Sequence, residues 1–165
     1  MKLSSSCTTN ANNISCQIDG DIVGQYPLRD RMYIGGSAKL ERCMIEQFPS
    51  GVIVKNSLEI HGFDKITVFP KDIAVYGDIH LKFCLNLREI EPGIEIQKSL
   101  IINWCKNFTT LPENLHIPGN LVIFGCKSFS SLPNGLTVDG TFYTDKMSLS
   151  LNGEIKLGGF KKYND

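Results

Sequence analysis

Three cysteines stand 21 residues apart, and thiols at a fixed spacing can bind a metal ion or act as nucleophiles. They are Cys84, Cys105 and Cys126, and Phe63 and Met147 hold the equivalent positions in neighbouring segments. Phenylalanine and methionine are apolar, so their presence in the column indicates a position that requires a buried apolar side chain and not a metal ligand. The three cysteines are therefore predicted to be thiols of the core. No CxxC pair supplies the spacing of zinc ligands. We therefore predict no metal site and no cofactor.

Histidine beside a carboxylate is the second group that could perform chemistry, here as an acid–base pair. His61 and His80 are expected at outward positions of neighbouring strands, with Glu59 and Lys82 nearby. No serine or cysteine nucleophile is expected beside them, and charged outward side chains are normally just solvated. The sequence therefore predicts no catalytic residues and a protein that is not an enzyme.

An internal repeat of 21 residues positions these side chains and organises most of the chain. Residues 27–48 fit the same pattern if one residue is allowed to slip. Two of the apolar columns that keep the period are Val52, Ile73, Ile94, Leu115 and Leu136, and Leu58, Ile79, Leu100, Leu121 and Phe142.

Within each unit, apolar residues alternate on either side of a turn, which predicts two short strands. No window shows helical periodicity, and prolines at the junctions would break a helix. The sequence thus predicts a mostly β fold, a β solenoid of about five to six turns. We expect a positive φ at the glycines of the turn, which are Gly36, Gly77, Gly119 and Gly140.

The unit at residues 111–133 resembles a bacterial leucine-rich repeat. It has the Leu121-x-Ile123 strand, Cys126 three residues later, and Leu132-Pro133. Such repeats are similar to those of the leucine-rich effectors of the IpaH and YopM group, which are delivered by type III secretion. The resemblance covers about residues 27–147 and implies a leucine-rich-repeat-like solenoid that binds proteins and acts in virulence.

Two departures from this family matter. Only about 18 residues follow the last unit, so we expect no counterpart of the ligase domain of the IpaH enzymes. An extra apolar pair, such as Val52 and Val54, precedes the main strand, which leaves a parallel β-helix as the alternative geometry.

A single repeat domain is expected over residues 18–165, with repeats over about 27–147 and caps at 18–26 and 148–165. The last cap alternates apolar residues as a closing strand or hairpin would. Residues 1–17 are rich in Ser, Thr and Asn, which predicts a disordered tail. That tail also resembles the secretion signals of type III effectors.

Composition and charge exclude several classes. The chain has 17 Lys+Arg and 17 Asp+Glu, so its net charge of zero argues against nucleic acid as a partner. No apolar run is long enough for a membrane span, and the amino terminus lacks the apolar core of a signal peptide. We expect secretion without a Sec signal into the host cytosol, with the bacterial cytoplasm as the alternative. Reduced thiols fit either compartment.

Outward strand positions change from charged in the first units to apolar and aromatic in the last ones. Solenoids bind partners on a continuous strand face, and aromatic residues anchor interfaces. The sequence therefore predicts a protein partner, expected to be a host protein. The predicted protein-binding residues are Ile101, Asn103, Trp104, Val122, Phe124 and Tyr143.

Two other functions remain open. One is a β-helical carbohydrate-active enzyme, for which Glu59 and Asp78 would be the carboxylates. The other is an intracellular or prophage scaffold that never leaves the bacterium.

Overall fold

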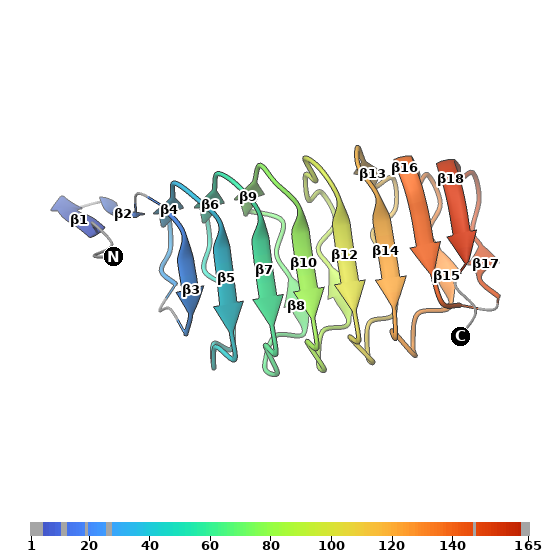
Figure 1. Cartoon of the computed structure of the whole chain (residues 1–165), viewed down its shortest axis with the longest axis horizontal. Helices are drawn as coiled ribbons and strands as arrows, with labels where there is room; N and C mark the ends of the chain where they lie inside the picture. Colours follow the sequence, from blue (N-terminus) through green and yellow to red (C-terminus); the bar gives the residue numbers. More distant parts are fainter. Residues whose placement is uncertain (1–4, 11–12, 19, 26–27, 147, 163–165) are drawn as a thin grey trace.

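The structure is a computed structural model that describes residues 5–10, 13–18, 20–25, 28–146 and 148–162. Every regular element within these residues is a β-strand, and no helix occurs among them. The strands stack into an elongated β-solenoid of about six turns with a period of about 21 residues (Figure 1). The mostly β solenoid predicted from the sequence is thereby confirmed. We call each circuit of the chain a coil.

The largest sheet, which we call the main sheet, takes one strand from each successive coil, and neighbouring strands run parallel (Figure 1). Its outward surface is the strand face. In spatial order its strands are β3 (Ile22–Gly24), β5 (Ala38–Glu41), β7 (Leu58–His61), β10 (Ile79–Lys82), β12 (Leu100–Asn103), β14 (Leu121–Phe124), β16 (Thr137–Thr144) and β18 (Lys156–Lys162).

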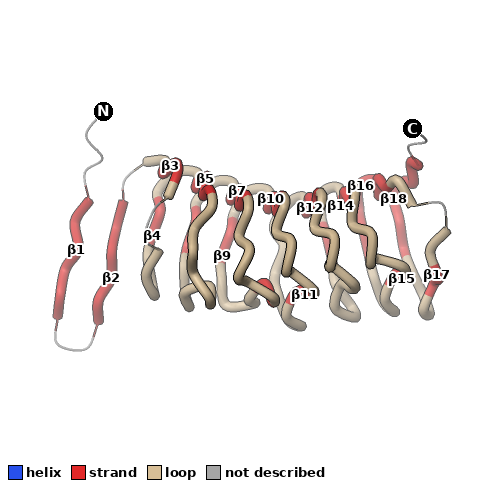
Figure 2. The backbone as a smooth tube through the Cα atoms, turned by 90° about the horizontal axis from the view of Figure 1, so that it is seen from below, coloured by secondary structure: helices blue, strands red, loops and turns tan. Residues whose placement is uncertain are grey.

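Shorter strands complete the coils away from the main sheet (Figure 2). A second sheet contains β1 (Ser5–Asn10), β2 (Asn13–Ile18), β4 (Tyr33–Ile34), β6 (Ile53–Val54) and β9 (Ala74–Val75). Further along, β13 (His116–Ile117) pairs with the first residues of β16 and so joins the main sheet. Two further parallel pairs are β8 (Val68–Phe69) with β11 (Glu89–Ile90), and β15 (Ser131–Leu132) with β17 (Ser150–Leu151).

The register of the paired strands matches the repeat seen in the sequence. Leu58 pairs with Ile79, Ile79 with Leu100, Leu100 with Leu121, and Leu121 with Phe142, which are steps of 21 residues. Adjacent parallel strands lie about 4.8 Å apart, so equivalent side chains stack directly on one another. All five are buried, as the apolar column predicts.

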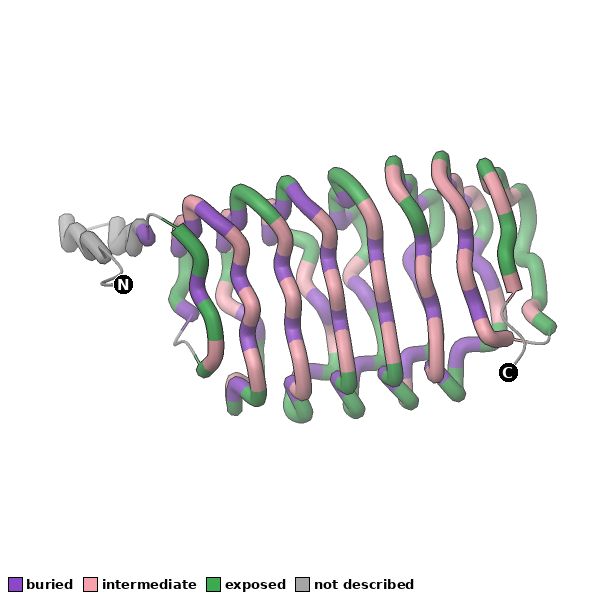
Figure 3. Tube along the Cα trace, viewed as in Figure 1, coloured by how far each residue is buried: buried purple, intermediate pink, exposed green. Residues whose placement is uncertain are grey.

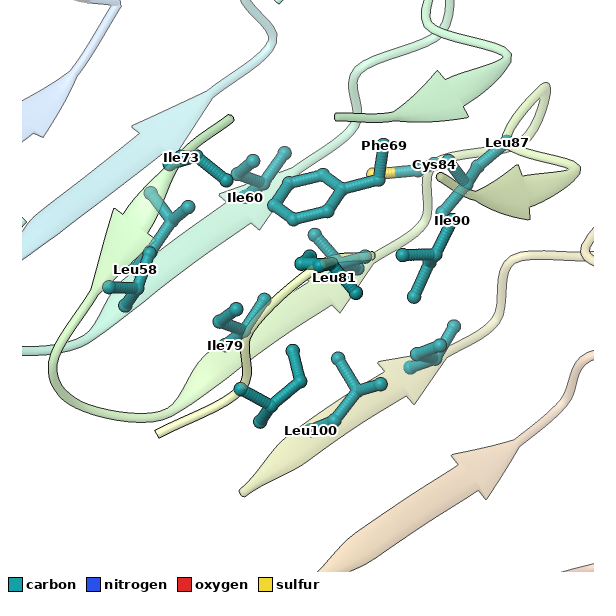
Figure 4. Packing of buried hydrophobic residues seen from close by; sticks show 14 of the residues in the cluster. Leu58, Ile60, Phe69, Ile73, Ile79, Leu81, Cys84, Leu87, Ile90 and Leu100 are labelled. Atoms are coloured by element: carbon teal, nitrogen blue, oxygen red, sulfur yellow. The ribbon is translucent and has the colours of Figure 1, made fainter. Parts of the chain in front are cut away.

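One continuous hydrophobic core runs through the coils. Buried and half-buried residues alternate along the strands of the main sheet, as Figure 3 shows. Figure 4 shows Phe69 lying beside Ile60 and Cys84, which come from different parts of the coils. Each such side chain contributes roughly 1.5–3 kcal/mol when fully buried, so the stability of a coil depends on the neighbours that cover it.

The sequence predicts a disordered tail over residues 1–17, of which the structure describes residues 5–10 and 13–17. β1 and β2 form an antiparallel hairpin, and β2 pairs in parallel with β4 through Gln17–Tyr33 and Ile18–Ile34. The exposed edge of β4 offers backbone groups that a further strand can satisfy, which explains why the ladder extends to this segment. The secretion signal expected in the same residues stays a prediction.

The carboxy-terminal residues 148–162 continue the solenoid in the same direction and do not fold back as a hairpin. β18 pairs in parallel with β16, which brings Leu157 beside Val138 and Phe160 beside Phe142. These steps are 19 and 18 residues, and the register shifts between Val138 and Thr141. The last coil therefore contains fewer residues than the 21-residue period, and the irregularity in its pairing lies within β16.

Four turn glycines are required for space and not for a positive φ. The positive φ predicted for them is wrong, because none of them is among the glycines with that conformation. A Cβ on Gly77 would lie 2.6 Å from the backbone carbonyl carbon of Asn56 in the previous coil. The backbones approach because the Gly77 N–H donates a 2.9 Å hydrogen bond to the Asn56 carbonyl. The same close approach occurs at Gly36, Gly119 and Gly140.

We expect Gly119→Ala to lower the free energy of unfolding by about 1–3 kcal/mol, because the added methyl group overpacks the turn. Its Cβ would lie 2.9 Å from the carbonyl carbon of Lys98. Urea unfolding followed by circular dichroism measures the change. The matched control is Lys98→Ala, one coil earlier in the same column, which should change stability by less than about 0.5 kcal/mol. Equal effects of the two substitutions would contradict the packing argument.

Candidate binding site on the strand face

Outward side chains of β12, β14 and β16 form two adjacent columns on the strand face. In-register pairing places Val122 between Ile101 and Tyr143, and it places Asn103 beside Phe124. All five side chains are half-buried. Because side chains alternate along a strand, these residues face outward while their neighbours enter the core. The structure therefore brings these predicted residues together in one contiguous patch.

A hollow of about 570 Å³ opens on this patch, and we call it the aromatic hollow. Ile101 does not line it, whereas Asn120, which the sequence pattern did not single out, does. The Oδ1 atom of Asn120 accepts a 2.8 Å hydrogen bond from the Thr141 N–H, which fixes its amide. The residues lining the hollow are Asn103, Trp104, Asn120, Val122, Phe124 and Tyr143.

Trp104 lies at the bend where the chain leaves the main sheet, and its backbone is strained. Its φ is 59°, and Phe83, the equivalent residue one coil earlier, has a φ of 54°. Gly62 and Gly125 hold the same position in the flanking coils, with φ of 70° and 64°. A bulky residue in this left-handed region costs roughly 1–3 kcal/mol. The chain thus places aromatic side chains where glycine would be unstrained.

Stacking holds these rings in place at the edge of the strand face. The rings of Phe83 and Trp104 are nearly parallel, with centroids 6.5 Å apart, and Phe83 also stacks on His61 at 5.1 Å. On its other side the indole lies over Gly125, where a Cβ would come too close to the ring carbons. Trp104 is 55% exposed and Phe83 is 44% exposed. We call His61, Phe83 and Trp104 the aromatic column.

Phe83 belongs to this surface although the sequence pattern did not single it out. A signal was present, because Phe83 and Trp104 stand in a 21-residue column whose flanking members, Gly62 and Gly125, are glycines. Arg42 begins the same column, also with a positive φ, so the bend position is not always glycine. Phe83 and Trp104 are its two large apolar members, and both are exposed outside the core. Replacement of glycine by such a residue is a sequence signal for an exposed aromatic site.

The amide of Asn103 carries an unsatisfied acceptor at the aromatic hollow. Its Oδ1 atom is buried and has no hydrogen-bond partner among the described residues. The Oδ1 atom of Asp145, in the same column of the repeat, is in the same state, while its Oδ2 accepts a 2.8 Å hydrogen bond from the Gly125 N–H. Burying an acceptor without a partner costs about 1–3 kcal/mol, and because this oxygen has almost no accessible surface the cost is borne by the fold itself.

Toward the amino terminus the strand face becomes charged, and its charges are paired. Lys82 lies 3.0 Å from Glu59, and Lys39 lies 3.5 Å from Glu41. Burial raises the pKa of Glu59, but the hydrogen bond and charge of Lys82 outweigh it, so this pKa lies below its ordinary value. Partly exposed pairs of this kind contribute about 0–1 kcal/mol. They leave little net charge on this part of the surface.

The histidines and carboxylates considered for catalysis have structural partners. Burial and the nearby Lys82 lower the pKa of His80. Asp78, the second carboxylate of the alternative enzyme, accepts a 2.9 Å hydrogen bond through Oδ1 from the Ser99 N–H. Glu59 is engaged by Lys82, and His61 is stacked in the aromatic column. His116 lies elsewhere and pairs with Asp139 at 2.8 Å.

The cysteine column lies inside the solenoid, where Cys84, Cys105 and Cys126 are all buried. Their S–H groups donate to backbone carbonyls, and that of Cys126 reaches the Phe124 oxygen at 3.4 Å. A hydrogen bond to Cys84 and burial raise the pKa of Cys105, and burial raises the pKa of Cys126 to about 11. The hydrogen bond with Cys105 lowers the pKa of Cys84, although burial opposes it. Cys43 begins the same column and is separated from the other three by Phe63, so the repeat provides a row of buried thiols.

In the described part of the chain, no group of three or more His, Cys, Asp or Glu side chains is arranged to hold a metal ion. No helix that could cross a membrane occurs among the same residues. Comparison of the chain with family models, curated proteins and solved structures finds no match.

Buried thiols should be unreactive in the folded protein. At pH 8 we expect Ellman's reagent to label none of Cys43, Cys84, Cys105 and Cys126 until denaturant is added, because the reagent cannot reach the buried sulfur atoms. A variant with Cys7→Ser and Cys16→Ser removes the remaining thiols from the assay. Rapid labelling of the folded variant would contradict the buried column.

Proposed function

We propose that this chain is a non-enzymatic protein-binding module whose partner docks on the carboxy-terminal half of the strand face. The observation that carries the proposal is the strained, exposed ring of Trp104 beside the aromatic hollow. Backbone strain in a folded protein persists only where the surrounding structure enforces it, and it concentrates at functional sites. The core does not need this ring, because the ring is 55% exposed and the next coil has glycine at the same position, Gly125.

The chemistry of the hollow suits a protein interface. Aromatic residues supply most of the energy at interface hot spots, and a ring that is already immobilised loses little entropy on binding. Phe83 and Gly125 hold the indole of Trp104 before any partner arrives. None of the residues that line the hollow carries a charge, so covering them requires no desolvation of an ion.

We also propose where the module acts, as an effector with leucine-rich-type repeats that is secreted by a type III system into host cells and binds a host protein. Two sequence features support this. Residues 3–17 carry no charge and are rich in Ser, Thr and Asn, and the repeats resemble those of leucine-rich effectors. The second candidate is an intracellular or prophage scaffold. The same repeats support it, and it differs from the effector in that the protein is not exported.

Removing the aromatic anchors should abolish binding without unfolding the protein. We expect Trp104→Gly combined with Phe124→Ser to reduce recovery of specific partners from host lysate at least about tenfold, as loss of hot-spot residues does. Trp104→Gly alone should change the free energy of unfolding by less than about 1 kcal/mol, because relief of backbone strain offsets the lost stacking. Quantitative mass spectrometry and urea unfolding measure the two effects.

Tyr76→Ser is the matched control for these variants. Tyr76 is also an exposed aromatic residue, 50% accessible, with Lys55 over its ring at 4.3 Å, and it follows β9 in the second sheet. This substitution should leave partner recovery unchanged. Full recovery with the Trp104 and Phe124 variant, or equal loss with Tyr76→Ser, would show that the binding surface lies elsewhere.

The amino-terminal residues decide between the effector and the scaffold. We expect residues 1–20 fused to a reporter enzyme to be exported by a strain with an active type III system and retained by an isogenic strain that lacks it. The control fusion omits residues 3–17, the uncharged segment. Retention of the full fusion in both strains would leave the intracellular scaffold as the better interpretation.

A further inference from the structure

We propose that Cys7 and Cys16 form an intrachain disulfide when the protein meets a disulfide oxidant such as glutathione disulfide, and that this bond locks the amino-terminal hairpin. The two residues are direct partners in the antiparallel ladder of β1 and β2. The hairpin extends the amino-terminal end of the solenoid, away from the aromatic hollow (Figure 2). The inference therefore goes beyond the proposed protein-binding function and does not depend on it.

The register of the hairpin gives these two residues the spacing that a disulfide requires. The ladder closes at Asn10 and Asn13, which only two residues separate in the sequence. In a hairpin with a two-residue loop the closing pair is hydrogen-bonded, and the pairs then alternate in type. The third pair beyond it, Cys7 with Cys16, is therefore non-hydrogen-bonded. The Cα atoms of such a pair lie about 4.5 Å apart, within the range of roughly 4.4–6.8 Å that a disulfide bridges.

This pair stands apart from the cysteine column of the core. Cys16 lies two residues before Ile18 in β2, so both belong to one face of the strand, and Cys7 shares that face as the direct partner of Cys16. β1 is the last strand of the second sheet, beyond β2 and β4. The remaining cysteines are free thiols that the core buries: Cys43, Cys84, Cys105 and Cys126.

A covalent link matters here because few other interactions hold β1. Its sequence, SSCTTN, has no large apolar side chain, and among the described strands β1 pairs only with β2. β2 in turn joins β4 through two register pairs, at Gln17 and Ile18. A two-stranded hairpin with so little apolar surface is marginally stable in water. A disulfide across it removes many conformations of the open chain, and so it favours the paired state.

The exchange with glutathione disulfide balances in two steps. One protein thiolate attacks a sulfur of glutathione disulfide, which releases one glutathione thiolate and leaves a mixed disulfide on the protein. The second protein thiolate attacks the protein sulfur of that mixed disulfide and releases the second glutathione. The two protein sulfurs lose two electrons, glutathione disulfide gains them, and the two thiol protons pass to the two glutathione molecules. A reducing glutathione pool drives the reaction backward, so the pair stays reduced in a cytosol and is oxidised outside it.

Equilibration of the full chain in buffers with stepped ratios of reduced to oxidised glutathione measures the bond. After acid quenching, denaturation and alkylation, we expect peptide mapping by mass spectrometry to find one disulfide, between Cys7 and Cys16, and four alkylated core cysteines. The matched control combines Ser6→Cys with Cys7→Ser, which keeps the number of thiols but moves one to the position opposite Gln17. A shift of one residue places that thiol on the other face of the hairpin, so its equilibrium constant for oxidation should be at least about tenfold lower.

Oxidation should also slow the opening of the hairpin. We expect amide hydrogen exchange of residues 5–10 and 13–18 to slow at least about tenfold in the disulfide form, while residues 28–146 exchange as before. Reduction with dithiothreitol should restore the faster exchange. Cys7→Ser should show the faster exchange under both conditions, and circular dichroism verifies that each variant keeps its strands.

Three results would overturn the inference. Cys7 and Cys16 could both stay alkylated at the most oxidising ratio, or their disulfides could join two chains instead of one. The variant with the shifted cysteine could oxidise as readily as the natural chain, which would mean that chain flexibility and not strand pairing brings the thiols together. Unchanged hydrogen exchange of the oxidised hairpin would likewise contradict the claim that the bond locks it.

Discussion

In-register parallel stacking of the coils is the interaction on which the rest of this structure depends. Each strand of the main sheet pairs with the equivalent strand one coil away, as Leu100 does with Ile79 and Leu121. The same stacking superimposes apolar side chains into continuous columns, so backbone hydrogen bonds and burial reinforce each other. Because every coil is covered by its neighbours, stability lies in the contacts between coils. The close approach at Gly77 and the buried row of thiols are local consequences of this stacking.

Functional information in such a molecule lies where a coil departs from the repeat. Most columns keep one chemical character, because replacing a residue would disturb both neighbouring coils. The bend column does not, since glycine at 62 and 125 gives way to Phe83 and Trp104. The replacement costs backbone strain and leaves both rings exposed. These strained and exposed rings are what supports the proposed protein-binding function.

The distribution of charge differs between the two ends of the strand face. The chain is neutral overall, and on the amino-terminal part of the strand face the charges occur as opposed partners, as in Glu59 with Lys82. The carboxy-terminal part replaces them with aromatic and amide side chains around the aromatic hollow. The amino-terminal end of the main sheet therefore presents paired charges, while the carboxy-terminal end presents aromatic rings and, at Asn103, a buried oxygen with no hydrogen-bond partner in the described part of the chain.

The sequence by itself determined the solenoid, its period and the outward patch, because a 21-residue repeat forces equivalent residues into columns. Ile101, Val122 and Tyr143 could be assigned to one surface on that basis alone. The tertiary structure decided what depends on contacts between coils. These are the left-handed bend at Trp104, its stacking on Phe83, and the strands formed by residues 5–10 and 13–18. Periodicity records which residues are equivalent, but not the backbone angle at a bend or the distance between neighbouring coils. For that reason periodicity alone predicts the wrong role for the turn glycines, and the stacking of Phe83 beside Trp104 follows only from the assembled coils.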